Sequence, residues 1–137
     1  MSRDVDVLQH SIVFDGFFRM ERYRLRHTLF GGGQSEELVR ELFRRGRVAA
    51  VLPYDPVRDA VVLVEQFRIG AIADDAGAWL LEPVAGYAEP GETLEEVAQR
   101  EAGEEAGVQL QALHRICDYY PSPGASSEHV SLFCGHV

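Results

Sequence analysis

The spacing of apolar and polar residues predicts β-structure at the start of the chain. Residues 12–30 contain the runs IVFDGFF and YRLRHTLF, whose alternating or aromatic character is typical of strands, and glycines at 31–33 end the second run. This pattern predicts a hairpin. The triple glycine is interpreted as a turn and not as a phosphate cradle, because no strand-to-helix fingerprint and no GKS or GKT sequence surrounds it.

The next segment, SEELVRELFRRG at 35–46, is ambiguous. Leu38, Val39, Leu42 and Phe43 recur at helical spacing, so periodicity alone predicts a helix. The preceding hairpin instead favours a strand that returns along it. The local pattern leaves both alternatives open.

Further strands are expected in the middle of the chain. Residues 48–55 and 60–67 form two apolar runs joined by an Asp-Pro turn. Residues 79–86, WLLEPVAG, form another strand candidate, in which Pro83 indicates an edge or a bulge. A final strand-rich region is interrupted by YYPSPGASS at 119–127.

A helix is expected over residues 94–106, and both of its ends are marked. Thr93 and Glu96 have the spacing of a capping box, and Gly107 is a natural C-terminal stop. The charge pattern of this helix is unusual. At 100° per residue, Glu101 and Glu105 fall within about 20° of Leu94, inside the apolar stripe.

An unpaired carboxylate costs several kcal/mol to bury, so a positive group is expected to meet these side chains. Glu101, Glu104 and Glu105 occupy positions i, i+3 and i+4, project from one side of the helix and can converge on a hard cation that prefers oxygen ligands. Magnesium is the expected ion. Glu95 and Glu96 point away from the stripe.

Composition and charge limit the classes of molecule that the protein is expected to bind. The 137 residues suit one globular unit, and a net charge of −9 argues against nucleic acid or an anionic membrane surface. A phosphorylated small molecule is compatible if a metal supplies positive charge. Cys117 and Cys134 form no CxxC and are expected to be reduced, and the N-terminus has neither the basic region nor the apolar run of a signal peptide. We therefore expect a cytoplasmic protein.

Residues 86–108 read GYAEPGETLEEVAQREAGEEAGV and resemble the Nudix box of the Nudix hydrolases. The positions that carry the resemblance are Gly86, Glu92, Arg100, Glu101, Ala102, Glu104, Glu105, Gly107 and Val108. The resemblance implies an α-β-α sandwich of the α/β class with a mixed sheet. It also implies hydrolysis of a nucleoside diphosphate linked to another moiety.

The same resemblance assigns roles to residues of the box. Glu101, Glu104 and Glu105 would be catalytic, and Glu101, Glu105 and the carbonyl of Ala85 would bind Mg²⁺, with Mn²⁺ as a possible substitute. Glu92 and Arg100 would form a structural brace, and Gly86 would permit close approach beside the metal.

Downstream, Pro123 lies 15 residues after Val108 in a Ser-Pro-Gly setting, which is similar to the ADP-ribose pyrophosphatase branch of the family. The GGG hairpin, the DPVRD turn and EQFRIG extend this resemblance over most of the chain. It implies substrate contacts from Phe17, Arg40, Arg68, Gly86, Ser122, Pro123 and Glu128.

In that branch Arg68 would contact the pyrophosphate, and Phe17 and Arg40 would stack on the adenine, one of them from a partner subunit. Glu128 would assist at the neighbouring site, and Ser122 with Pro123 would shape its wall. For Phe17, burial in the core is an equal alternative. For residues 34–45, the resemblance favours a strand over the helix.

The expected organisation is an N-terminal strand domain at 1–46, exchanged within a homodimer, and a Nudix hydrolase domain at 47–137. The chain ends on SLFCGHV without a cap or closing helix, so this domain is expected to lack its C-terminal part. The expected reaction is Mg²⁺-dependent hydrolysis of ADP-ribose to AMP and ribose 5-phosphate. The alternatives are another nucleoside diphosphate sugar and a regulatory module that binds ADP-ribose without cleaving it.

Overall fold

The computed structural model describes residues 3–137, and the chain divides into two compact units. One unit comprises Met1–Gly46 with Tyr120–Glu128, and the other comprises Arg47–Tyr119 with His129–Val137. Residues 120–128 belong to the first unit because backbone hydrogen bonds join them to the strand that contains Phe43. The Phe43 N–H donates to the Ala125 carbonyl at 2.7 Å, and the Ser127 N–H donates to the Phe43 carbonyl at 3.1 Å.

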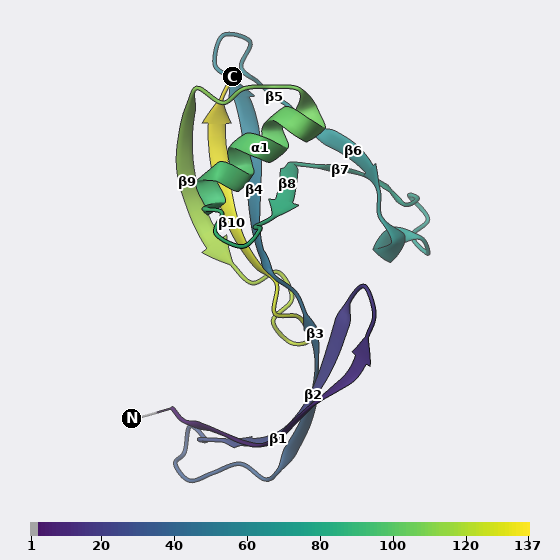
Figure 1. The fold of residues 1–137 in the computed structure, drawn as a ribbon, viewed down its shortest axis with the longest axis vertical. Helices are drawn as coiled ribbons and strands as arrows, with labels where there is room; N and C mark the ends of the chain where they lie inside the picture. The colour runs from purple at the N-terminus through teal and green to yellow at the C-terminus, as the bar shows by residue number, and fades with distance from the viewer. Residues whose placement is uncertain (1–2) are drawn as a thin grey trace. The chain divides into compact units, whose positions relative to one another are not determined.

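The first unit is a three-stranded antiparallel sheet of β1 (Val5–Asp15), β2 (Arg19–His27) and β3 (Leu38–Arg44) (Figure 1). The expected hairpin is β1 with β2. The triple glycine forms a turn before β3, in which Gly32 and Gly33 take φ values of 87° and 79°. These left-handed values favour glycine.

Residues 38–44 form a strand, so the helix predicted from periodicity alone is wrong. The whole of β3 pairs with β2, from Arg19 opposite Arg44 to Leu25 opposite Leu38. Pairing with a neighbouring strand satisfies the backbone groups of β3, and this tertiary context outweighs a weak local preference.

A buried carboxylate lies in the first unit. Glu21 on β2 is only 4% exposed, and Arg44 on β3 donates to both of its oxygens, at 3.0 and 2.7 Å. The Tyr23 hydroxyl donates to it at 2.7 Å, and His10 Nε2 lies at 3.1 Å. Arg44, and after it Tyr23, lower the pKa of Glu21 from its ordinary value of 4.5 to about 2.

The second unit is built around β4 (Arg47–Asp55). Along one edge, β4 pairs antiparallel with β5 (Ala60–Val61) and β8 (Val84–Tyr87), and along the other it pairs parallel with β10 (His129–His136). Antiparallel to β10 runs β9 (Ala112–Tyr119). The mixed sheet of the predicted α/β class is confirmed.

A separate two-stranded ribbon consists of β6 (Val64–Phe67) and β7 (Trp79–Glu82), with the short 3₁₀ helix η1 (Ile69–Ala71) between them. The expected strands 60–67 and 79–86 are therefore each divided between two sheets. In the second, the break falls at Pro83, which has no N–H to donate to a ladder.

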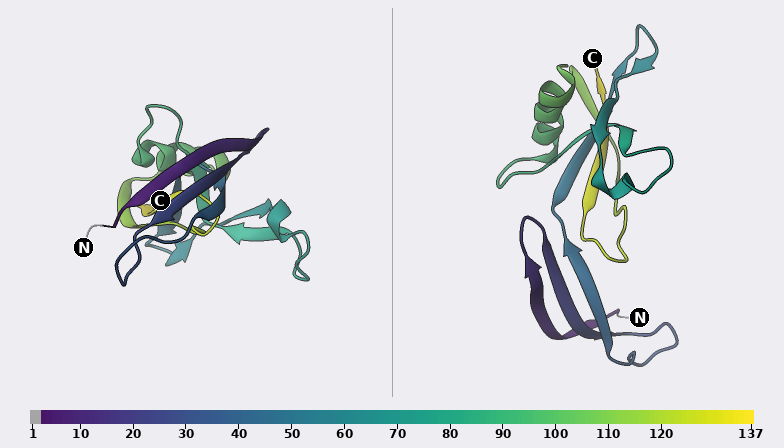
Figure 2. Two further views of the ribbon diagram at one scale, coloured as in Figure 1. Left: turned by 90° about the horizontal axis from the view of Figure 1, so that it is seen from below. Right: turned by 90° about the vertical axis from the view of Figure 1, so that its right-hand side faces the viewer.

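Helix α1 (Leu94–Ala106) lies across one face of the sheet of the second unit (Figure 2). It is the one α-helix in residues 3–137, so these residues supply one helical layer of the expected sandwich. The core between α1 and the sheet consists of Ala49, Val51, Val84, Leu94, Val97, Ala98, Ala102, Leu110 and Phe133. Across residues 3–137, no helix is long and apolar enough to span a membrane.

Both predicted ends of α1 are confirmed. Thr93 and Glu96 form a reciprocal capping box, with the Glu96 N–H donating to Thr93 Oγ1 at 3.2 Å and the Thr93 N–H donating to Glu96 Oε2 at 2.8 Å. Gly107 ends the helix at φ 66°. The position and direction of α1 are thus fixed by local chemistry as well as by packing.

Replacing Gly107 with alanine should destabilise the protein by about 1 kcal/mol, because a Cβ disfavours the left-handed backbone. The matched change Gly103→Ala, inside the same helix and in open space, should stabilise it by about 0.5–1 kcal/mol. Urea unfolding of both variants measures the two effects. Effects of the same sign would contradict this account of the helix end.

The contacts of Glu21 should make the stability of the fold depend on pH in the acidic range. Because the folded pKa of Glu21 is about 2, below its ordinary value of 4.5, the charged pair stabilises the fold above pH 4.5. That contribution is lost as the pH falls towards 2. Thermal unfolding between pH 2 and 6 should show a weaker pH dependence in Glu21→Gln than in the wild type. The exposed control Glu36→Gln should retain the wild-type profile.

Candidate active site

The candidate site is built where β8 approaches α1. Gly86 on β8 pairs with Ala49 of β4, and a Cβ added to Gly86 would lie 1.7 Å from Oε1 of Glu101 and 2.5 Å from its Cγ. The side chain of Glu101 therefore occupies the space that any larger residue at 86 would need. Here glycine is required by a close approach and not by its backbone conformation.

Arg100 ties the loop between β8 and α1 to the helix. Its Nε and Nη2 donate to the two carboxylate oxygens of Glu92 at 2.9 and 3.1 Å, and Nη2 also donates to the Tyr87 carbonyl at 3.2 Å. The Glu89 N–H donates to Glu92 Oε2 at 3.1 Å. Arg100, followed by this backbone contact, lowers the pKa of Glu92.

Arg100 is also the positive group that meets Glu101. Its Nη1 donates to Glu101 Oε1 at 2.6 Å, and the Glu101 side chain is only 14% exposed. A weaker contact of 3.3 Å joins the same Nη1 to Glu104, whose side chain is 63% exposed. One guanidinium therefore faces three carboxylates of the segment.

Glu105 was expected to lie within the buried stripe of α1. The structure shows instead that Glu105 is exposed. The reason lies in β8, which within the described residues pairs with β4 alone and so presents its other edge to the helix. From that edge the Ala85 N–H donates to Glu105 Oε2 at 3.3 Å. Gln66 Nε2 on β6 donates to Oε1 of the same carboxylate at 2.8 Å.

The donor set has the chemistry of a site for a hard divalent cation. Glu101, Glu104 and Glu105 offer carboxylate oxygens on one side of α1. The Ala85 carbonyl leaves β8 at the same edge as the Ala85 N–H, since both groups of a strand residue point the same way. Within residues 3–137, however, no three His, Cys, Asp or Glu side chains converge closely enough to hold a metal. The carboxylates instead contact Arg100 and Gln66.

Arg68 lies at the end of β6 and is bound to Glu82 of β7. Its Nε donates to both Glu82 oxygens at 2.9 Å, and Nη2 donates to Oε2 at 2.6 Å. Glu82 is the main reason that the pKa of Arg68 is raised. The guanidinium fork is oriented by this pair, and an anion that approached it would compete with Glu82.

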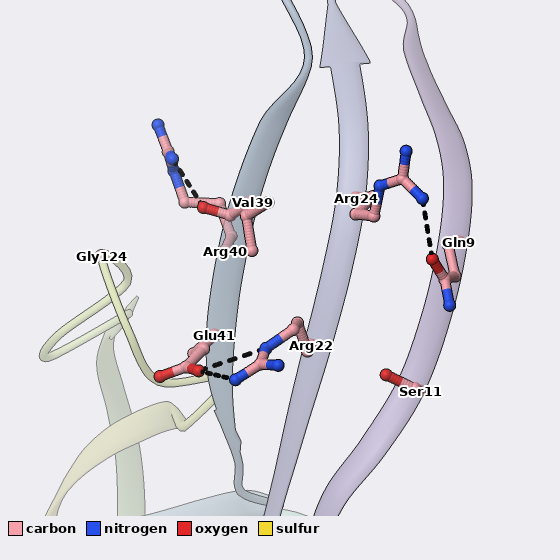
Figure 3. A pocket seen from close by; sticks show the side chains of 8 residues that line it. All are labelled: Gln9, Ser11, Arg22, Arg24, Val39, Arg40, Glu41 and Gly124. Atoms are coloured by element: carbon pink, nitrogen blue, oxygen red, sulfur yellow. Dashed lines mark hydrogen bonds and ion pairs between the residues drawn. The ribbon is translucent and has the colours of Figure 1, made fainter.

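The remaining expected substrate residues lie in the first unit. Phe17, in the turn between β1 and β2, is 96% exposed, so in this chain it is not part of the core. Arg40 on β3 is exposed and borders a pocket of about 720 Å³ on this sheet. In Figure 3 its side chain extends away from the Arg22–Glu41 and Arg24–Gln9 pairs.

That pocket is also bordered by Gly124, which follows the exposed residues Ser122 and Pro123 in the loop of the first unit. The Ser122 carbonyl accepts the Ser126 N–H at 2.9 Å, which closes this loop into a turn. Glu128, at the end of the loop, accepts a hydrogen bond from Arg45 Nε at 2.9 Å. The structure therefore brings Arg40 close to this loop within one unit.

Two residues of the second unit were not predicted from the sequence, Gln66 and Glu82. A signal for Gln66 was present, because it lies two residues before Arg68 in an extended segment, where alternate side chains share a face. Glu82 was hidden, since its partner depends on β6 pairing with β7.

Comparison with known proteins identifies the family of the chain. Residues 44–135 match the NUDIX domain. The chain belongs to the NUDIX family. Nudix hydrolases generally use divalent metal ions, in agreement with the oxygen donors of α1. The Nudix segment supplies β8, the loop and the helix described above.

Relatives of known function cover nearly the whole chain. It is 47% identical over 134 residues to an ADP-ribose pyrophosphatase of Escherichia coli strain K12, which covers 98% of this chain and 64% of that protein. A Haemophilus influenzae ADP-ribose pyrophosphatase is 44% identical over 138 residues, with the same two coverages. The chain thus spans a little under two thirds of the length of these relatives.

More distant similarities agree with the family assignment. A GDP-mannose pyrophosphatase of Yersinia pestis strain Pestoides F is 31% identical, over 97% of this chain and 67% of that protein. A solved structure described as an ADP compounds hydrolase superposes with a TM-score of 0.72 at 22% identity, covering 96% of this chain and 66% of that one. At this identity the superposition shows a shared fold.

The close approach at Gly86 predicts a selective effect of one methyl group. Gly86→Ala should force the Glu101 carboxylate away from Arg100 and cost about 1–3 kcal/mol of stability. The control Gly31→Ala, with nothing within 4 Å and no left-handed backbone, should cost far less. Equal free energies of unfolding for the two variants would show that Glu101 does not need the space at 86.

Proposed function

We propose that the protein is a Mg²⁺-dependent ADP-ribose pyrophosphatase that produces AMP and ribose 5-phosphate. The observation that carries the proposal is the acidic edge between β8 and α1, where Glu101 fills the space beside Gly86 and Glu105 contacts Ala85. The proposal is also supported by relatives of this name at 44–47% identity over 98% of the chain.

In this proposal Glu101, Glu105 and the Ala85 carbonyl would hold the Mg²⁺ ion, with Glu104 as a further catalytic carboxylate. Mn²⁺ is an expected substitute. When bound, the ion would polarise the diphosphate and position water. An acidic protein can accept an acidic substrate in this way. The Arg100–Glu92 pair would act as a brace, because it holds the loop against the helix without being needed for substrate contact.

The other substrate contacts follow from the chemistry of the side chains. Arg68 would contact the pyrophosphate, since a guanidinium fork suits phosphate oxygens, and for this it would exchange contacts with Glu82. Phe17 and Arg40 would stack on the adenine, which their exposure favours. Glu128 would assist at the neighbouring site, and Ser122 with Pro123 would shape its wall. Gly86 would permit the close approach of Glu101 beside the metal.

We further propose a cytoplasmic homodimer in which residues 1–46 form an N-terminal domain that is exchanged between subunits, with residues 47–137 in the Nudix domain. In support of this, the first unit exposes large apolar side chains on β1 and in the turns that follow β1 and β2. Val7, Phe14, Phe17 and Phe30 are 51%, 58%, 96% and 86% exposed. Exposed apolar surface of this kind is typical of interaction sites. Sedimentation velocity measures the oligomeric state.

A second candidate substrate is GDP-mannose, since a GDP-mannose pyrophosphatase is also among the relatives. Turnover of ADP-ribose and GDP-mannose, each with and without Mg²⁺, distinguishes the two candidates. Preferred, Mg²⁺-dependent cleavage of ADP-ribose is expected. Binding of ADP-ribose without any cleavage would overturn the enzymatic proposal in favour of a regulatory module.

Glu105→Gln should lower turnover of ADP-ribose by more than about tenfold, because the change removes a ligand charge and keeps the size of the side chain. Loss even of a residue that merely supports a metal ligand costs about 10–100-fold. Glu95→Gln, about 80° away from Glu105 around the same helix and outside the proposed metal ligands, should leave turnover close to that of the wild type. Comparable rates for the two variants would show that the faces of α1 are wrongly assigned.

A further inference from the structure

Gln66 reaches from β6 to the last turn of α1. Its Nε2 donates to Oε1 of Glu105 at 2.8 Å, while the Ala85 N–H donates to Oε2 at 3.3 Å. Both oxygens of an exposed carboxylate are therefore held, one from β6 and one from β8. An exposed glutamate would otherwise sample several rotamers and lose that freedom when it binds an ion.

The side-chain group that donates to Glu105 is neutral, whereas the group that donates to the neighbouring carboxylates is charged. Glu101 and Glu104 are held by the cationic Arg100, which offsets their charge and would compete with a bound cation. Gln66 is a neutral donor. It fixes the direction of Glu105 and leaves the full negative charge available, together with the remaining lone pairs of the carboxylate.

The backbone that carries Gln66 is held in place by strand pairing. Gln66 pairs with Leu80 in the β6–β7 ribbon, and Arg68, one residue beyond β6 in extended backbone, is held by Glu82 of β7. The charge of Glu105 contributes to the raised pKa of Arg68, so the two groups interact. One short segment, β6 with the residue after it, therefore supports a proposed metal ligand and carries a proposed pyrophosphate contact.

We propose that Gln66 is a positioning residue that preorganises Glu105 for the divalent cation and aligns it with Arg68. This inference rests on the proposed function and deepens it, because it assigns a supporting role at the same site. Residues that orient metal ligands commonly change metal affinity or activity by about 10–100-fold. The neutral amide of Gln66 is suited to that role.

The principal test is Gln66→Met, which keeps the size of the side chain and removes the donor. Two readouts are measured on the protein: the Mg²⁺ concentration that gives half of the rise in Tm without substrate, and the concentration that gives half-maximal turnover of ADP-ribose. Both should increase about tenfold. At saturating Mg²⁺ the rate and KM should approach those of the wild type.

The matched control is Gln99→Met on the same helix, where the amide donates to the Leu110 carbonyl at 3.3 Å. Its Mg²⁺ dependence should equal that of the wild type. An unchanged Mg²⁺ dependence in Gln66→Met would overturn the proposal. If Gln66→Met does not fold, the same two readouts are measured on Gln66→Asn, which keeps the amide one methylene short of Glu105. An unchanged Mg²⁺ dependence in that variant would likewise overturn the proposal.

An exchange of the two side chains tests the contact without metal or substrate. Gln66→Glu should lower the metal-free Tm, because two carboxylates would face each other. Adding Glu105→Gln should restore the Tm, because the new amide can donate to the new carboxylate. A double variant no more stable than Gln66→Glu would contradict the contact. If the wild type cleaves no ADP-ribose, the proposed function fails, whereas the Tm measurements still decide the role of Gln66.

Discussion

The candidate site depends on the contacts of one guanidinium group, that of Arg100. It binds Glu92 of the preceding loop, the Tyr87 carbonyl at the end of β8, and Glu101 one residue further along α1. Loop, strand and helix are therefore joined through a single planar group, whose several N–H donors make this geometry possible. Lysine has a single charged nitrogen and would not satisfy these acceptors in the same arrangement.

The same contacts leave an excess of negative charge. Arg100 is shared among Glu92, Glu101 and Glu104, while the donors to Glu105 described above are the neutral amides of Gln66 and Ala85. Glu101, Glu104 and Glu105 lie on one side of α1, where like charges at this spacing repel each other, and a divalent cation that binds them would relieve the repulsion in the folded state. The electrostatics thus give a physical reason for metal binding that is independent of the family assignment.

Much of α1 could be predicted from sequence, because its limits are set by local chemistry. The capping box at Thr93 and the left-handed Gly107 act within a few residues of themselves. Residues 38–44 were ambiguous for the opposite reason, since their pairing with β2 is a tertiary contact that no local periodicity records. The break at Pro83 was only partly foreseen, because the proline indicates an irregularity without saying which sheet each half joins.

The candidate site likewise has some features that local sequence determines and others that depend on tertiary contacts. A positive partner for the Glu101 carboxylate was expected from the helix pattern, and a close approach at Gly86 was implied by the family resemblance, whereas the group that approaches Gly86, Glu101 itself, was not foreseen. The contacts of Gln66 and Glu82 could not be predicted, because they require knowing that β6 pairs with β7 and reaches α1. Sequence therefore indicates the candidate residues of the site, and the strand pairing determines which other residues contact them.

The central claim is that the acidic edge between β8 and α1 binds a divalent cation. Anomalous diffraction from crystals grown with Mn²⁺, the expected substitute for Mg²⁺, locates such an ion directly. The account predicts an anomalous peak within coordination distance of oxygens of Glu101 and Glu105, with the Ala85 carbonyl among its ligands. A fully occupied Mn²⁺ ion elsewhere, with these carboxylates still bound to Arg100 and Gln66, would contradict it.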